Sequence, residues 1–211
     1  DEASVASVRK RIGLRRGEGY FAVSLRPLGG CGGDFDSRIS RAVRDVSIKT
    51  GLSPVIVPMQ SGEDRALCER ICALSVGSAY TAPFSDTDSI AALFAGAAFT
   101  VGMRLHSIIY SACVGTPVLA VSYDPKIDAA CAYLGLPAPL SAFTVTSEEM
   151  LASLPELSES VPRERIAYLR GLCEEDCRRI IGAVREERIS DKEKARRHGR
   201  VGGYDDIYGY I

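Results

Sequence analysis

Two polar side chains in an otherwise apolar stretch are the residues best suited to chemistry. The stretch covers residues 99–125, FTVGMRLHSIIYSACVGTPVLAVSYDP, and the two residues are Arg104 and His106. A guanidinium can hold a carboxylate or phosphate through two parallel hydrogen bonds, and the ordinary pKa of histidine suits proton transfer near neutral pH. The pair therefore predicts a site for an anion and a proton transfer. A solvated charge beside a structural histidine is the alternative interpretation.

The surrounding pattern predicts where the pair lies. Residues 99–101 are typical of a buried strand, residues 105–114 of a helix that ends at Gly115, and residues 118–121 of a second strand. Strand, helix and strand make a βαβ unit with a right-handed crossover between parallel strands. Ligands of such sheets bind beyond the carboxyl ends of the strands, where helix N–H groups favour anions. The pair is predicted at such a position.

The rest of the chain continues the alternation of strands and helices, which predicts an α/β fold with one doubly wound parallel sheet. Arg26 ends the first predicted strand and so shares the predicted site edge with Arg104. In the helix at 34–50, Ile39, Val43, Val46 and Ile48 are expected to face inward. Further strands are predicted at 20–25, 53–57 and 79–82, with an edge strand at 143–145, and further helices at 3–12, 63–76, 89–97, 128–134, 147–154 and 163–187.

Composition indicates a soluble globular protein and argues against a nucleic-acid partner. The 211 residues have a formal net charge of −1, and no apolar run is long enough to span a membrane. Cysteines spaced by four could share a helix face, but no CxxC pair completes a metal site. We expect no metal and reduced thiols, mostly in the core of a cytoplasmic protein. The seven cysteines are Cys31, Cys68, Cys72, Cys113, Cys131, Cys173 and Cys177.

Five short motifs resemble the polysaccharide pyruvyl transferase family. The most specific are GMRLH at 102–106, GTP at 115–117 and SYDPK at 122–126; SLRP at 24–27 and PMQ at 58–60 are weaker. The resemblance covers residues 20 to 187. It implies a single Rossmann-like domain similar to the C-terminal domain of GT-B-type transferases. It also implies transfer of the pyruvyl group of phosphoenolpyruvate onto two sugar hydroxyls, which forms a ketal and releases phosphate, with no metal or organic cofactor.

The resemblance also implies roles for single residues. Arg104 and Arg26 would hold the anionic groups of phosphoenolpyruvate, and His106 would be the catalytic acid or base. Lys126 and Tyr123 are further substrate-binding candidates at the same edge. The neighbouring aspartate, Asp124, either caps the following helix or acts on the substrate.

Family members usually carry another Rossmann-like domain before this one, so we expect a partner domain in cis or in trans. The acceptor would be a glycan or lipid-linked saccharide, and the protein would be cytoplasmic, with peripheral association at the inner face of the membrane as an option. We expect three segments: a helical linker at 1–19, the Rossmann-like domain at 20–188, and a basic, then Tyr-rich tail at 189–211.

Two other functions are compatible with the sequence. The first is a nucleotide-sugar-dependent glycosyltransferase of GT-B type, in which Arg104 and Lys126 grip a diphosphate. The second is a non-catalytic domain that binds a partner protein through its long charged helix or its Tyr-rich tail.

Overall fold

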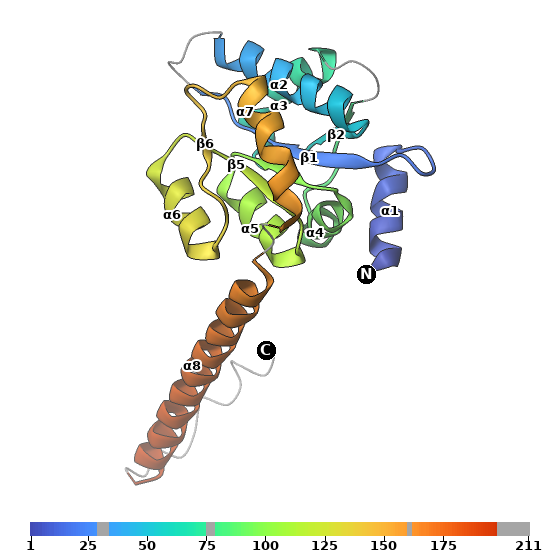
Figure 1. Cartoon of the computed structure of the whole chain (residues 1–211). Coiled ribbons are helices and arrows are strands. Elements are labelled where there is room, and N and C mark those ends of the chain that lie inside the picture. The colour runs from blue at the N-terminus through green and yellow to red at the C-terminus, as the bar shows by residue number, and fades with distance from the viewer. Residues whose placement is uncertain (29–33, 75–78, 160–161, 198–211) are drawn as a thin grey trace. The chain divides into compact units, whose positions relative to one another are not determined.

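Six parallel strands form one sheet, and helices cover both of its faces (Figure 1). The computed structural model describes residues 1–28, 34–74, 79–159 and 162–197. The chain divides into two units, Asp1–Ile166 and Ala167–Ile211, and the sheet belongs to the first. The predicted doubly wound parallel sheet is therefore confirmed.

The strand order places a topological switch between β1 and β4. These two strands pair with each other. The strands after β1 are added on one side and the strands after β4 on the other, which gives the order β3-β2-β1-β4-β5-β6. In the β1–β4 ladder, Ser24 is the register partner of Gly102. The strands are β1 (Tyr20–Ser24), β2 (Ser53–Ile56), β3 (Tyr80–Thr81), β4 (Thr100–Gly102), β5 (Val118–Ser122) and β6 (Leu140–Ser141).

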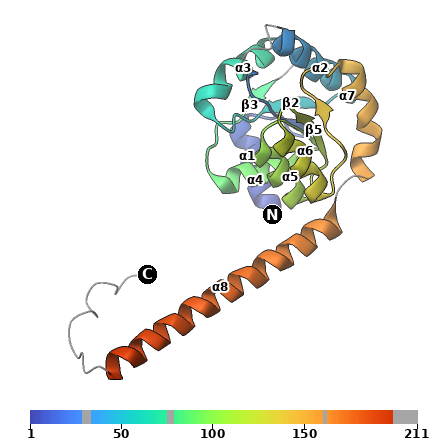
Figure 2. The ribbon, with the colours of Figure 1, turned by 90° about the vertical axis from the view of Figure 1, so that its left-hand side faces the viewer.

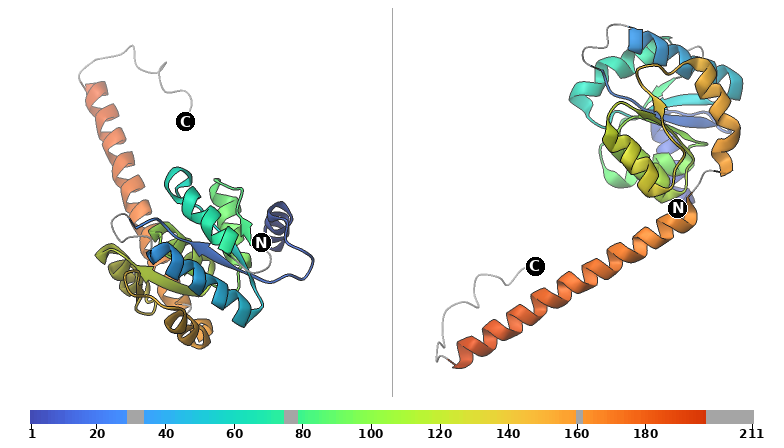
Figure 3. Two further views of the ribbon diagram at one scale, coloured as in Figure 1. Left: turned by 90° about the horizontal axis from the view of Figure 1, so that it is seen from above. Right: turned by 60° about the vertical axis from the view of Figure 1, so that its left-hand side comes forward.

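Two hydrophobic clusters hold the helices against the sheet. Phe21 and Val23 of β1 point to the side covered by α2, α3 and α7, and Tyr20 and Ala22 point to the side of α1 and α4. Figure 2 shows these two layers, and the left view of Figure 3 looks down on the α2 side. Because both faces are covered, every residue of β1 and β5 is buried.

The helices alternate with the strands as the sequence predicts. The helix at 34–50 and the helix at 105–114 have the expected bounds. The helices are α1 (Glu2–Ile12), α2 (Asp34–Thr50), α3 (Ser61–Leu74), α4 (Thr87–Gly96), α5 (Leu105–Val114), α6 (Pro125–Leu134), α7 (Ser147–Ser153) and α8 (Arg163–Arg197), with a 3₁₀ turn at Leu154–Glu159.

Two local predictions are wrong. The edge strand is β6, not residues 143–145, because the backbone N–H groups of Thr144 and Val145 both donate to the carbonyl of Ser141 and close a turn. Ile48 does not face inward: its side chain is 63% exposed. It lies two residues after Val46, and residues two apart do not share a helix face.

The cysteines are distributed between core and surface. Cys68 and Cys131 are buried as predicted, and Cys72 is half-buried, whereas Cys113, Cys173 and Cys177 are exposed, so the prediction of core positions is wrong for these three. The remaining cysteine, Cys31, lies outside the described residues, as does the Tyr-rich tail. Within the described ranges, no helix is both long and apolar enough to cross a membrane.

Candidate active site

The carboxyl ends of β1 and β4 carry the two arginines selected from the sequence. The ladder continues one residue past the pair Ser24 and Gly102, because the N–H of Met103 donates to the carbonyl of Ser24 at 2.8 Å. Arg26 and Arg104 each follow two residues after that pair. They therefore leave the sheet side by side at the switch point, which is the usual ligand position in this class of sheet.

A close approach between β4 and α5 fixes the start of that helix. A Cβ at Gly102 would lie 3.0 Å from Ile108 Cγ1 and 3.3 Å from Ser107 Oγ, so a larger residue would push the helix away. The Ser107 hydroxyl donates to the carbonyl of Arg104 at 2.6 Å. Arg104 is the N-cap residue of α5 with an extended backbone, and its side chain makes no capping bond. The guanidinium is thus free to reach across to α3.

Arg104 binds two carboxylates in the first turn of α3. Its Nε lies 3.2 Å from Asp64 Oδ2, its Nη2 also donates to Asp64 Oδ1, and Nη2 lies 3.1 Å from Glu63 Oε2. Asp64 is fully buried and also accepts the N–H of Gln60 at 3.0 Å. Burial lowers the pKa of Arg104, but the hydrogen bonds and charges of Asp64 and Glu63 outweigh it, so the pKa is raised. Arg104 is therefore a firmly held cation.

Arg26 connects this ion pair to the end of β5. Its Nη2 lies 4.0 Å from Glu63 Oε2, and its Nη1 donates to the Tyr123 hydroxyl at 3.2 Å. The guanidinium carbon lies 4.8 Å from the Tyr123 ring centre, a cation–π distance. Arg26 thus touches both a carboxylate and a phenol.

Tyr123 lies between two cations. The Nζ atom of Lys126 lies 5.4 Å from the centre of the Tyr123 ring. The same Nζ atom also pairs with Asp124 Oδ2 at 3.3 Å. Burial raises the pKa of Tyr123, but hydrogen bonds and charges from Arg26 and Lys126 outweigh it, so the pKa is lowered. Asp124 is the N-cap of α6 and accepts the N–H of Lys126 at 2.9 Å, as one of its two predicted roles requires.

His106 is the second residue of α5 and is exposed. Among the residues that the structure describes, its imidazole has no hydrogen-bond or ion-pair partner. Contacts therefore link four of the five predicted site residues, namely Arg104, Arg26, Tyr123 and Lys126, while His106 shares only the helix start with Arg104. An exposed imidazole remains available to a substrate.

Sequence reasoning missed Glu63 and Asp64. One signal could have found them: they follow the carboxyl end of β2, the strand that pairs directly with β1. Carboxyl ends of neighbouring parallel strands lie at one edge of the sheet, so acidic residues there can meet Arg26 and Arg104.

A cavity of about 290 Å³ opens beside Tyr123, at the ends of β5 and β6. It is lined by Ser122, Tyr123, Asp128, Ser141 and Phe143, among others. A larger cavity of about 630 Å³ lies between α3, α4 and the ends of β2 and β3. The smaller cavity approaches the size of common small-molecule pockets and combines hydroxyls, a carboxylate and aromatic rings.

An open parallel sheet with this strand order and a switch point between β1 and β4 defines a Rossmann-like domain, and its fold resembles that of a domain of GT-B-type glycosyltransferases. The chain belongs to the polysaccharide pyruvyl transferase family, whose model matches residues 14–125. The matched region contains Arg26, Glu63, Arg104, His106 and Tyr123.

The chain is similar to solved structures at low sequence identity. ADP-heptose lipopolysaccharide heptosyltransferase II of E. coli is 14% identical with a TM-score of 0.55, over 75% of this chain and 52% of that one. A glycosyl transferase of family 9 from Veillonella parvula is 10% identical with a TM-score of 0.49, over 78% and 53% of the two chains. The chain thus spans about half the length of these proteins. No curated protein matches it.

Proposed function

We propose that this chain is the donor-binding half of a pyruvyl transferase that moves the pyruvyl group of phosphoenolpyruvate onto two hydroxyls of a cell-surface polysaccharide sugar. One observation carries the proposal: two guanidiniums, Arg104 and Arg26, converge on a single carboxylate oxygen at the switch point. A donor that carries a carboxylate and a phosphate would find matching cations there.

The reaction needs one proton at the donor's methylene carbon and must remove one from each of two sugar hydroxyls. Protonation of that carbon leaves a cationic centre at the neighbouring carbon, and the first hydroxyl attacks it and loses its proton. The second hydroxyl then displaces phosphate, which leaves with a proton, so the charges balance. In this proposal His106 exchanges these protons, because it is exposed and unpartnered among the described residues.

The remaining predicted site residues bind the donor in this scheme. Arg104 and Arg26 hold the donor's anionic groups, and Lys126 and Tyr123 contact it from the end of β5. The acceptor, a glycan or lipid-linked saccharide, would be bound mainly by a second domain in cis or in trans. We propose that the reaction takes place in the cytoplasm, at the inner face of the membrane when the acceptor is lipid-linked.

A donor screen by calorimetry tests the proposal. We expect the purified protein to bind phosphoenolpyruvate and not uridine or guanosine diphosphate sugars. Preference for a nucleotide sugar would instead indicate a glycosyltransferase, and binding of no donor would favour a non-catalytic domain.

A His106→Ala variant tests the catalytic role. In the complete protein that carries this chain, we expect phosphate release from phosphoenolpyruvate with an acceptor saccharide to fall by about 10²–10⁴-fold. Donor binding should persist, because the cations are unchanged. The control is Cys113→Ala, an exposed position near the end of the same helix. Full activity of His106→Ala would remove His106 from the mechanism.

A further inference from the structure

Glu63 occupies the position where the two arginines would hold a ligand. Its Oε2 lies 3.1 Å from Arg104 Nη2 and 4.0 Å from Arg26 Nη2. We propose that Glu63 is a gate of the anion site: its carboxylate holds the site closed, and a ligand's carboxylate or phosphate must displace it. The inference rests on the proposed function, since it concerns the same donor site.

The neighbouring carboxylate shows why Glu63 is the one that moves. Asp64 is fully buried, binds Arg104 through Nε and Nη2, and also accepts the N–H of Gln60. Removing one partner from such a buried pair costs several kcal/mol. The Glu63 side chain is 51% exposed, and exposed ion pairs contribute only about 0–1 kcal/mol. Asp64 therefore positions Arg104, whereas Glu63 can leave it at little cost.

The charges around the site lead to the same conclusion. Three cations, Arg104, Arg26 and Lys126, are matched by three carboxylates, Asp64, Glu63 and Asp124. The group is therefore neutral and does not by itself attract an anion. When Glu63 turns toward water, the arginines gain uncompensated positive charge: Arg26 Nη2 loses its carboxylate partner, and Arg104 Nη2 keeps only Asp64.

Competition with an internal carboxylate lowers the affinity of the site for every anion by the same factor. A ligand with one anionic group would only replace the contacts that Glu63 already provides. A donor with two anionic groups replaces Glu63 and gains a second set of contacts with Arg26 or Lys126. The second set of contacts offsets the cost of displacing Glu63, so a donor with both a carboxylate and a phosphate should bind, whereas pyruvate or free phosphate should bind weakly.

The test compares anion binding by the wild-type protein and by Glu63→Gln, with phosphoenolpyruvate and inorganic phosphate as probes in calorimetry. Because an ion pair worth up to about 1 kcal/mol no longer competes, we expect Kd for both probes to decrease by about 2- to 5-fold in the variant, and by the same factor since both displace the same carboxylate. The control, Glu69→Gln, removes an exposed carboxylate further along α3 and should leave both values unchanged.

The two probes separate the gate from the proposed function. Equal Kd values in Glu63→Gln and wild type would overturn the gate and leave phosphoenolpyruvate as the donor. Tighter phosphate binding by the variant without phosphoenolpyruvate binding would support the gate and contradict the donor. If neither protein binds either anion, the gate is overturned as well. Thermal unfolding of each variant checks that it is folded.

Discussion

At the scale of single residues, the contacts of Arg104 depend on its planar guanidinium, whose N–H donors point outward like a fork. Two different nitrogens of Arg104 make its contacts with the carboxylates. Nε and Nη2 both donate to Asp64, and Nη2 also donates to Glu63. A lysine offers one nitrogen at the end of a flexible chain and cannot reproduce this arrangement. The fork therefore fixes the direction in which the positive charge faces the site.

We expect Arg104→Lys to weaken phosphoenolpyruvate binding by about 10-fold or more, although the charge is kept. The free energy of unfolding should fall by about 1–3 kcal/mol, because buried Asp64 loses part of its hydrogen bonding. Calorimetry and urea denaturation measure the two effects. The control is Arg41→Lys, at an exposed position of α2. Unchanged donor affinity would show that Arg104 does not contact the donor.

The residues of the candidate site could be predicted only in part. Arg26 and Arg104 follow from the rule that ligands gather at the carboxyl ends of parallel strands, and Tyr123 and Lys126 follow from the family motif. The sequence pattern does not single out Glu63 and Asp64, because acidic residues in a first helical turn are already explained by the helix dipole. Only the strand order shows that this turn faces the arginines.

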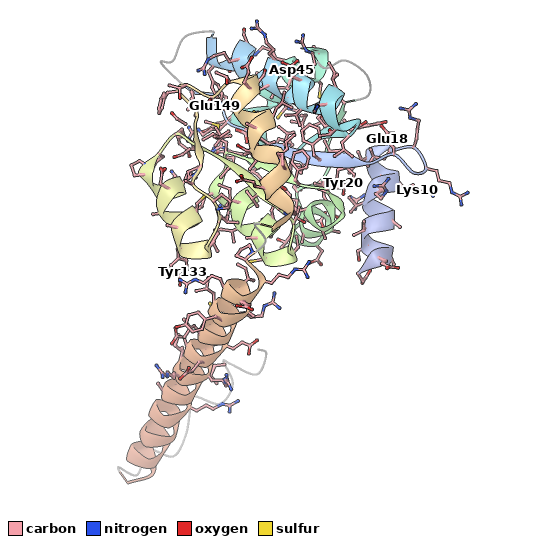
Figure 4. All side chains as sticks on the ribbon, viewed as in Figure 1. Lys10, Glu18, Tyr20, Asp45, Tyr133 and Glu149 are labelled. Atoms are coloured by element: carbon pink, nitrogen blue, oxygen red, sulfur yellow. The ribbon has the colours of Figure 1, made fainter. Side chains whose placement is uncertain are left out.

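At the scale of elements, one carboxylate joins the segments at the amino ends of three strands. Glu18 lies between α1 and β1, beside the start of β1 (Figure 4), and accepts hydrogen bonds from Ser53 Oγ at 2.6 Å and from the Tyr80 hydroxyl at 3.1 Å. The N–H of Arg15 also donates to it, at 2.9 Å. Burial raises the pKa of Glu18, but these bonds outweigh burial and lower the pKa to about 2.

This shift predicts a pH-dependent contribution to stability. The unfolded-state pKa is about 4.3, so the ionised carboxylate stabilises the fold fully at neutral pH, and this contribution is lost as pH falls from about 5 toward 2. We expect Glu18→Gln to lower the free energy of unfolding by about 1–3 kcal/mol at pH 7, with a smaller difference from wild type at pH 3. Urea denaturation at several pH values measures this.

An exposed glutamate provides the control for that experiment. Glu156→Gln should change stability little at either pH, since Glu156 is exposed on the 3₁₀ turn. A Glu18→Gln difference that does not change with pH would mean that Glu18 acts through packing alone.

Element boundaries were predictable where a specific residue sets them. Gly51 and Gly115 adopt positive φ angles of 70° and 81°, and the helices α2 and α5 end at the expected residues before them. The edge strand was not predictable, because residues 143–145 have strand-forming side chains but their backbone closes a turn onto Ser141. A two-residue strand has no periodicity to detect.

At the scale of the whole molecule, the buried hydrophobic residues of the described chain all lie between Val8 and Leu157. They fall within the first unit, Asp1–Ile166. The described side chains of the unit Ala167–Ile211 therefore contribute none of them, and all six strands of the sheet lie in the first unit.

We therefore expect a chain that ends after Ile166 to unfold in one cooperative transition, with Tm within about 5 °C of the full chain. Arg165, which donates to the carbonyl of Tyr133 at 2.8 Å, remains present in this variant. Differential scanning calorimetry measures the transition. A matched chain that ends after Ser153 removes buried Leu157 and should lose several degrees more. A broad transition for the chain that ends after Ile166 would show that the second unit is needed for folding.

The two outermost strands, β3 and β6, have only two residues each. Edge strands this short leave few unpaired backbone N–H and C=O groups. This disfavours edge-to-edge aggregation and the addition of a strand from another chain. Recruitment of a second domain or subunit would then depend on side chains of helices and loops, so its specificity could change through surface substitutions while the sheet stays the same.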